Sequence, residues 1–261
     1  MRRAPFTARI APKKPPNQSI IGGTVPDADA LARLSSLGAR TGNDNPAAGD
    51  AADVVVLAVK PQVMETVARD LAASIQARRP LVISIAAGIR TADLERWLGG
   101  NVALVRCMPN TPALVQSGAT ALFANVRVTE GQRDVAETIL RAVGLTLWLD
   151  DEGQMDAVTA LSGSGPAYFF LVIEALQAAG EQLGLPAGSA RLLALQTAFG
   201  AAKMALESDE DAATLRRRVT SPGGTTERAI QTLEAGGIRD LIGRALAAAR
   251  DRSRELADEL G

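Results

Sequence analysis

The sequence predicts an α/β protein in which a doubly wound parallel sheet precedes an all-helical region. Short apolar runs alternate with helical stretches between Asp53 and Asp150, and this alternation is typical of a parallel sheet covered on both faces. After Gln154 the apolar runs give way to long Ala- and Leu-rich segments with helical spacing. We therefore expect two domains, covering residues 1–153 and 154–261.

The first domain can be followed element by element. Strands are expected at Asp53–Val59, Pro80–Gly88, Asn101–Asn110 and Gly144–Asp150. Helices are expected between them, at Pro61–Ile75, Thr91–Gly99 and Glu130–Val143. Because ligands of such sheets bind at the carboxyl ends of the strands, the loops that follow these strands form the expected site.

The second domain is predicted to contain three long helices and to form dimers. The first helix follows Pro166, and the other two cover Gly188–Ser208 and Ile238–Leu260. Their many Ala and Gly residues would let the helices approach one another closely. The helices are also too apolar to remain exposed as a lone bundle, so we expect a homodimer that they mediate.

Composition excludes several classes of function. The formal net charge is −1 and there is no histidine, so we expect no nucleic-acid partner, no Ser-His-Asp triad and no histidine metal site. The single cysteine, Cys107, provides neither a disulfide nor a thiolate cluster. We see no apolar run of about 20 residues and no secretory signal, which predicts a cytoplasmic protein without a membrane partner. An enzyme of this composition would take its reactive group from a cofactor.

The amino-terminal region lacks a motif that a dinucleotide-binding unit requires. Such a unit needs a strand, a G-x-G-x-x-G turn, a helix and a second strand within roughly 30 residues. Four prolines lie between Pro5 and Pro16 and disfavour regular structure, and Gly22 and Gly23 do not make the turn. We therefore expect residues 1–26 to be atypical and the phosphate-binding turn to be missing.

The segment Ser162–Pro166 (SGSGP) opens the first long helix and has two main interpretations. As local structure, Ser162 or Ser164 caps the helix and Pro166 lies in its first turn. As a site, the glycines let a ligand approach the backbone, and the exposed N–H groups suit a carboxylate. A dinucleotide turn is a weaker hypothesis because no strand precedes the segment.

Three other loops also admit a structural and a functional interpretation. Lys60 ends the first clear strand, but it could be a solvated lysine before a proline that starts a helix. In CMPNTPA, Cys107 is expected to be a small core residue, whereas Asn110 offers both a donor and an acceptor. In SPGGTT, Thr225 or Thr226 could cap the next helix or face a small polar ligand.

Together, five motifs in this order resemble pyrroline-5-carboxylate reductase. They are AVKPQ, SIAAGI, RCMPNTPA, DAVTALSGSGPAYFF and VTSPGGTTERAI. The resemblance runs from about residue 45 to residue 261. It implies a Rossmann-like domain, a helical domain that interlocks in a homodimer, which can assemble further into a ring of dimers, and reduction of 1-pyrroline-5-carboxylate to L-proline by NADPH or NADH, the last step of proline biosynthesis.

The resemblance also implies roles for individual residues. Thr226 matches the catalytic threonine that hydrogen-bonds the ring nitrogen of the substrate. Because a hydroxyl is a weak acid, we expect it to position a proton already on the substrate. Substrate contacts are implied at Ser164, Asp209, Gly224, Thr225 and Thr226. Cofactor contacts are implied at Asn45, Ala58, Val59, Lys60, Pro61, Ala86 and Ala87.

The amino terminus departs from this family. Family members begin with a strand and a glycine turn, followed by a helix that ends in a segment like Ser19–Gly23 (SIIGG). Between that segment and PDADALARL we find no room for the rest of the helix and a second strand. Losing the turn would remove backbone contacts to the pyrophosphate. The alternative function is therefore a catalytically impaired homologue that persists as a folded helical dimer.

Overall fold

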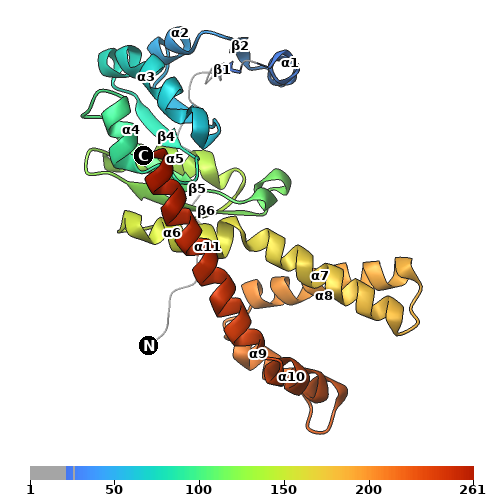
Figure 1. Ribbon diagram of the computed structural model, residues 1–261. Coiled ribbons are helices and arrows are strands. Elements are labelled where there is room, and N and C mark those ends of the chain that lie inside the picture. The colour runs from blue at the N-terminus through green and yellow to red at the C-terminus, as the bar shows by residue number, and fades with distance from the viewer. Residues whose placement is uncertain (1–21, 26) are drawn as a thin grey trace.

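The computed structural model describes residues 22–25 and 27–261, and it confirms the predicted order of a sheet region followed by helices (Figure 1). The main sheet has five strands in the order β3-β4-β5-β6-β7. Their bounds are β3 Val54–Leu57, β4 Leu81–Ser84, β5 Leu104–Met108, β6 Gly118–Ala124 and β7 Gly144–Trp148. Every strand expected from the sequence is present, and each is somewhat shorter than its apolar run.

Strand β6 was not expected, and it makes the sheet mixed. It runs antiparallel to β5, with Cys107 opposite Leu122, and parallel to β7. Its sequence, GATALFA, is rich in small residues and follows β5 after the short 3-10 turn Thr111–Val115. A connection of that length can reverse the chain, whereas a parallel connection needs a dozen or more residues.

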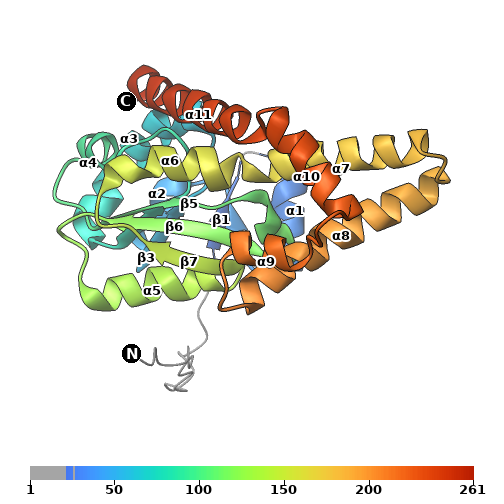
Figure 2. The ribbon, with the colours of Figure 1, turned by 90° about the horizontal axis from the view of Figure 1, so that it is seen from below.

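Helices cover both faces of the main sheet, as a doubly wound fold requires (Figure 2). Their bounds are α3 Pro61–Arg78, α4 Thr91–Trp97 and α5 Glu130–Arg141. One buried cluster joins α3 and α4 to the sheet through Met64, Leu94 and Leu104. A second joins α5 to the opposite face through Ala136, Leu140 and Ile83. The alternation of side chains along each strand sends neighbouring residues into different clusters.

A separate two-stranded sheet precedes the main one. Strands β1 (Gly22–Thr24) and β2 (Arg40–Gly42) pair in parallel, and α1 (Ala28–Ser36) connects them. This corrects the sequence analysis, which placed Gly22 and Gly23 at the end of a helix and left no room for a further strand. Ser19, Ile20 and Ile21 of that segment lie outside the described residues. The motif alone misled because helix and strand are hard to distinguish in a short apolar run.

The two sheets are not joined by hydrogen bonds within the described residues. β1 pairs only with β2, and β3 pairs only with β4, so each has one unpaired edge in the described part of the chain. The short helix α2 (Asn45–Asp50) lies between them in sequence and packs against α3. Within residues 22–25 and 27–261 the two sheets are therefore separate, and the first strand and glycine turn of a Rossmann unit would lie outside these residues.

Every described element after β7 is helical. These helices are α6 Met155–Val158, α7 Gly165–Gln182, α8 Ala187–Glu207, α9 Ala212–Arg218, α10 Thr225–Ala235 and α11 Ile238–Leu260. A 3-10 turn, Glu152–Gln154, precedes α6, and a π-helical segment, Thr159–Gly163, joins α6 to α7. Helices α7 and α8 form a long hairpin that projects beyond the sheet (Figures 1 and 2).

The last helix returns to the sheet region. α11 runs from α10 back toward α4 (Figure 1), and Leu260 packs against the cluster that contains Leu94 and Leu104. Ser253 also donates a 2.7 Å hydrogen bond to Asp156 on α6. The last helix is therefore attached both to the core of the sheet region, through Leu260, and to α6, through Ser253. Sequence periodicity did not indicate this arrangement.

The helical stretch Glu152–Gln182 is long and apolar enough to cross a membrane by length and composition, and only 11% of its most apolar window is buried. The sequence analysis saw no such run, because charged residues flank the apolar core of the segment. Length and composition are weak evidence for a span, since an apolar helix of a protein interface meets the same criteria.

Candidate functional site

The carboxyl ends of three neighbouring strands bring the predicted cofactor loops together. Leu57 at the end of β3 pairs with Ser84 at the end of β4, which pairs in turn with Arg106 on β5. Because these strands are parallel and in register, the loops that begin at Ala58 and Ile85 leave from the same edge. The AVKP and AAG motifs, about 25 residues apart in sequence, thus become neighbours.

The loop after β3 ends at a helix terminus suited to an anion. Lys60 is the N-cap residue of α3, its side chain is exposed, and it makes no capping hydrogen bond. Pro61 occupies the first turn, where a missing N–H costs nothing. The remaining N–H groups of this first turn, the positive end of the helix dipole and the lysine charge all favour a phosphate here.

The loop after β4 is small and closely packed. Ala86 is buried and Ala87 half-buried, so short side chains form the surface on which a flat ring could lie. Gly88 has a φ of 75°, a left-handed conformation that suits glycine. A Cβ at that position would lie 3.6 Å from Leu256 and Leu260 of α11. The helical region therefore supports this loop from behind.

The loop after β5 contacts the SGSGP segment directly. Asn110 accepts a 2.8 Å hydrogen bond from the backbone N–H of Ala119 and donates a 3.3 Å bond to the Ser162 hydroxyl. Gly163 packs so closely on the Met108 side chain that a Cβ would collide with it. This close approach explains why a glycine is needed at position 163. The π-helical segment around it is a feature often found at functional sites.

Ser164 lies at the start of α7 but does not cap it. It is the N-cap residue, yet its side chain makes no capping hydrogen bond, and its own N–H bonds to the Thr159 carbonyl. Tyr168 donates a 3.0 Å bond to the Ala160 carbonyl and so braces the π-helical segment. Ser164 is therefore placed next to the β5 loop with its hydroxyl not committed to the cap.

Cys107 is a core residue, as expected. It is 1% exposed and packs in the cluster on the α5 face of the sheet. Burial raises the pKa of its thiol to about 12, because an apolar environment disfavours the thiolate. Burial therefore favours the neutral thiol at neutral pH, which fits a core residue better than a nucleophile.

Among the described residues, several could contact the nicotinamide end of a dinucleotide. The small residues Ala58, Ala86 and Ala87 and the α3 terminus suit a nicotinamide and an adjacent phosphate. The N-termini of α1 and α2 do not suit a pyrophosphate, because Asp27 and Asp44 already cap them with hydrogen bonds of 2.7 and 2.9 Å to Ala30 and Ala47. Carboxylates there repel a phosphate. Within the described residues, no strand leads into a G-x-G-x-x-G turn.

Asn45, the remaining predicted cofactor residue, is held between β1 and α3. Its side-chain oxygen accepts a 2.6 Å hydrogen bond from Thr24, and its amide donates a 3.3 Å bond to Asp70. The side chain thus connects the small sheet to the helix that follows β3. Nothing in this geometry tests a contact with cofactor, which stays a prediction.

The SPGGTT loop forms a second, separate group. Gly224 is the N-cap of α10, and neither Thr225 nor Thr226 caps the helix by its side chain. Gly223, with a φ of 72°, donates a 2.8 Å hydrogen bond to the Glu227 carboxylate, which fixes the turn. The purely structural interpretation of the two threonines as caps is therefore wrong for this chain. The first N–H groups of α10 have no side-chain partner within the described structure.

A single chain does not bring the two groups together. α9 and α10 lie at the end of α11 farthest from α3 and α4 (Figures 1 and 2). Asp209 is exposed in the link between α8 and α9. Arg218 forms an ion pair with Glu210 in that link. Ser164 thus belongs with the sheet-edge group, whereas Asp209 and Gly224–Thr226 belong to the part of the chain around α9 and α10.

Sequence reasoning missed a shielded ion pair near the sheet edge, between Arg106 and Glu152. Arg106 lies in the middle of a predicted apolar strand, yet its side chain is 6% exposed and pairs with Glu152 at 2.8 Å. Thr91 donates two hydrogen bonds to the same Glu152 carboxylate. The presence of Arg106 within an apolar run could have indicated this pair, because a buried arginine needs a partner of opposite charge.

Comparisons with known proteins decide the family. The family model "Pyrroline-5-carboxylate reductase dimerisation" matches residues 152–256, and "NADP oxidoreductase coenzyme F420-dependent" matches residues 6–88. A pyrroline-5-carboxylate reductase of Pseudomonas aeruginosa is 57% identical over 210 residues, covering 80% of this chain and 77% of the relative. The chain belongs to the pyrroline-5-carboxylate reductase family.

Solved structures support the same assignment. A pyrroline-5-carboxylate reductase from Coxiella burnetii superimposes with a TM-score of 0.87 at 49% identity, covering 91% of this chain and 88% of that one. The pyrroline carboxylate reductase of Plasmodium falciparum, solved with NADP bound, has a TM-score of 0.77 at 31% identity and covers 84% of this chain and 82% of that one. The resemblance noted in the sequence motifs is thereby confirmed, and with it the Rossmann-like fold class.

Proposed function

We propose that this pyrroline-5-carboxylate reductase family member reduces 1-pyrroline-5-carboxylate to L-proline, with NADPH or NADH as the reductant. The observation that carries the proposal is the contact between the β5 loop and SGSGP, through Asn110–Ser162 and Met108–Gly163. This contact brings the start of α7 next to the β5 loop, and it supports a substrate position near the edge that carries Ala86 and Ala87. The 57% identity to the Pseudomonas aeruginosa reductase supports the same chemistry.

The chain's own residues would bind and orient the reactants. A reduced nicotinamide supplies a hydride to the imine carbon. Ala58, Val59, Lys60, Pro61, Ala86 and Ala87 would form the surface for that ring and its neighbouring phosphate. The N–H groups at the start of α10 would bind the substrate carboxylate, and the Thr226 hydroxyl would accept a hydrogen bond from the protonated ring nitrogen. Most of the rate would come from this orientation.

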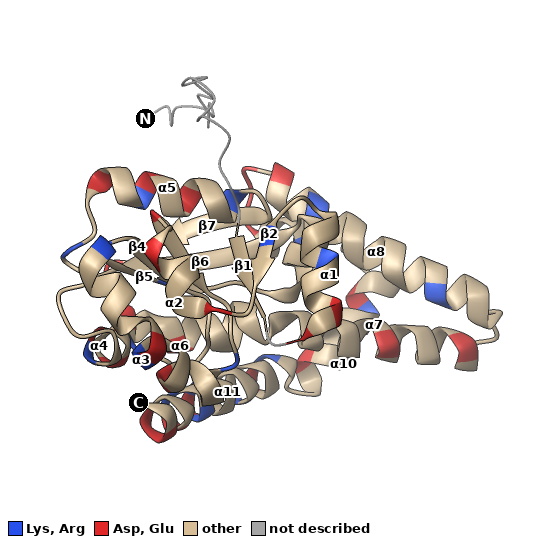
Figure 3. Ribbon diagram, turned by 90° about the horizontal axis from the view of Figure 1, so that it is seen from above, with Lys and Arg blue, Asp and Glu red and all other residues tan. Residues whose placement is uncertain are grey.

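We further propose that two copies of the chain are needed to complete the site. Within one chain, α10 lies far from the sheet edge (Figure 1), so Thr226 would act on a nicotinamide bound by the partner. Large apolar side chains on the α7–α8 hairpin are exposed, including Phe169 (68%), Phe170 (64%) and Phe199 (62%). In Figure 3, most of the ribbon of this hairpin is tan, the colour of residues other than Lys, Arg, Asp and Glu. A second copy that covers it would account for the exposure.

The same proposal explains the apolar stretch Glu152–Gln182 without a bilayer. We propose a cytoplasmic homodimer, with a boundary between the two domains near residue 153. Further assembly into a ring of dimers would leave the hairpin contacts unchanged. Light scattering on the purified protein in the absence of detergent would give the subunit number. A mass of one chain only would contradict the dimer.

The activity is tested by adding 1-pyrroline-5-carboxylate to the purified protein and following the loss of NADPH absorbance. Proline should form in equal amount. The impaired alternative rests on the G-x-G-x-x-G turn that was not found in the sequence, and a fluorescence titration with NADPH separates it from a working enzyme. A dissociation constant above about 1 mM, which corresponds to roughly −4 kcal/mol, would favour the impaired homologue.

A further inference from the structure

The Glu152 carboxylate connects three parts of the chain at the base of the proposed cofactor surface. It accepts a 2.8 Å hydrogen bond from the Thr91 backbone N–H and a 2.6 Å bond from the Thr91 hydroxyl. It also accepts a 2.8 Å bond from the Arg106 guanidinium. Arg106 is 6% exposed at its side chain and Glu152 is 22% exposed. All three donors therefore meet one carboxylate that is largely shielded from water.

The position of this carboxylate follows from the fold. Arg106 is on β5, in register with Ser84, the last residue of β4. Thr91 is the first residue of α4 and ends the loop that carries Ala86 and Ala87. Arg90, the N-cap of α4, provides no side-chain capping bond. Glu152, from the 3-10 turn that precedes α6, supplies the missing acceptor at this helix terminus.

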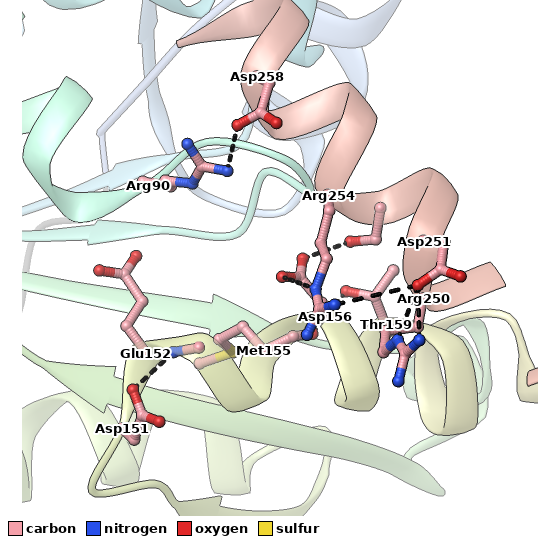
Figure 4. Close-up of polar contacts among 12 residues, drawn as sticks. Arg90, Asp151, Glu152, Met155, Asp156, Thr159, Arg250, Asp251, Arg254 and Asp258 are labelled. Carbon is pink, nitrogen blue, oxygen red and sulfur yellow. Dashed lines mark hydrogen bonds and ion pairs between the residues drawn. The ribbon is translucent and has the colours of Figure 1, made fainter. Parts of the chain in front are cut away.

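The same loop is fixed from its other side by α11. Arg90 forms a 2.6 Å ion pair with Asp258, and Gly88 packs against Leu256 and Leu260. Figure 4 shows Arg90 extended toward Asp258, with Glu152 on the side of α6 that faces the Arg90 segment. The end of the loop between β4 and α4 is therefore attached both to the 3-10 turn before α6, through Glu152, and to α11, through Asp258.

We propose that Glu152 and Thr91 are positioning residues: they fix the position of the Ala86–Ala87 loop relative to the nicotinamide that would bind on it. This rests on the proposed function, since it assigns those alanines to the cofactor. The hydroxyl of Thr91 fixes the end of the loop against Glu152, and the hydrogen bond from Arg106 holds the Glu152 carboxylate in its orientation. Neither Glu152 nor Thr91 touches the reacting atoms. Their effect is on cofactor affinity and not on the chemical step.

Thr91→Val tests this with little change of shape. Valine replaces the hydroxyl by a methyl group and keeps the backbone N–H bond to Glu152. We expect the KM for NADPH to rise about tenfold, because the loop that carries Ala86 and Ala87 is no longer held at its end. The KM for 1-pyrroline-5-carboxylate should stay close to wild type, whereas the melting temperature should fall, because a hydrogen bond to a charged group is lost. Thr91→Ser restores the hydroxyl and should restore the KM for NADPH.

A matched control comes from the far edge of the sheet. Thr146 on β7 donates a 3.3 Å hydrogen bond to Glu137 on α5, so Thr146→Val removes a threonine–glutamate bond away from the loop. It should leave the KM for NADPH unchanged. An equal rise in both valine variants, or no rise in Thr91→Val, would overturn the proposal.

Hydrogen exchange separates this proposal from the proposed function. In the protein without cofactor, amides of residues 85–90 should exchange several-fold faster in Thr91→Val than in wild type or Thr91→Ser, because local opening becomes easier. Unchanged exchange in this loop would rule out positioning even if the enzyme is active. If wild type reduces no imine, the proposed function fails, and the exchange rates still decide whether Glu152 and Thr91 position the loop.

Discussion

The sheet region and the α7–α8 hairpin, called the arm below, differ in how much of their apolar surface a single chain buries. The largest fully buried side chains all lie between Met64 and Met155. In the α7–α8 hairpin, by contrast, most large apolar side chains are more than half exposed, among them Phe170 and Leu192. The sheet region has its own core, whereas the arm has an apolar face without a covering layer in a single chain. Burial of apolar area is the main favourable term in folding and association, so the arm should depend on a partner.

The largest effect is expected from a charge on the arm. Phe170→Asp should shift the protein from dimer to monomer and abolish activity, because each dimer would bury a carboxylate in an apolar contact. We expect dimer affinity to fall at least about a hundredfold, or roughly 2.7 kcal/mol, as measured by analytical ultracentrifugation.

Leu37→Asp is the matched control for this change. Leu37 is 83% exposed at the end of α1 in the sheet region, and the substitution should leave both mass and activity unchanged. If Phe170→Asp still gives a dimer of normal activity, the arm is not the interface.

The next effect concerns the start of α10. Thr226→Ala should lower kcat by about a hundredfold, near 2.7 kcal/mol in transition-state stabilisation, with an unchanged melting temperature because Gly224 is the N-cap residue and Thr226 does not cap the helix. Thr232→Ala, which removes a hydroxyl bonded to the Arg228 carbonyl on the same helix, should keep wild-type turnover. Normal kcat in Thr226→Ala would exclude its proposed role.

Ion pairs give a comparison within the sheet region. Glu152→Ala leaves the buried Arg106 charge without its carboxylate and should destabilise the protein by about 3 kcal/mol in urea unfolding. Glu65→Ala removes an exposed pair with Arg69, whose side chains are 53% and 58% exposed, and should cost less than about 1 kcal/mol. Equal losses in the two variants would show that Arg106 is solvated in solution.

The last effect appears only above neutral pH and comes from Cys107. Burial raises its pKa from 9.0 to about 12 in the folded protein. The unfolded chain therefore loses the thiol proton first as the pH rises. Stability from this group is fully present below pH 9.0 and falls between there and about pH 12, by at most about 1.4 kcal/mol per pH unit.

Cys107→Ala should show a flatter decline in this window than wild type when unfolding is measured at each pH. The other titrating groups are common to both proteins, so the difference isolates the thiol. Parallel stability curves would show that the thiol of Cys107 is not held neutral by burial.

Much of the fold was predictable because it depends on local patterns. The β-branched run at Val54–Val56 and the apolar run at Leu81–Ser84 specify strands, and Pro61 and the Thr129–Gln132 capping box specify helix starts. The motifs at the strand ends also indicated the family and the sheet-edge residues. Strand β6 was missed because its small residues carry a weak pattern, and β1 was misplaced because three residues are too few to show a period.

The sequence by itself determined the α/β class, the all-helical region after residue 153 and the set of candidate loops, because period and turn chemistry are properties of neighbouring residues. Only the tertiary structure showed that Gly163 lies on Met108, that Glu152 joins Thr91 to Arg106, and that α11 returns to the sheet. It also separated Thr226 from the sheet edge. These features arise from contacts between residues distant in sequence, and no local period encodes such contacts.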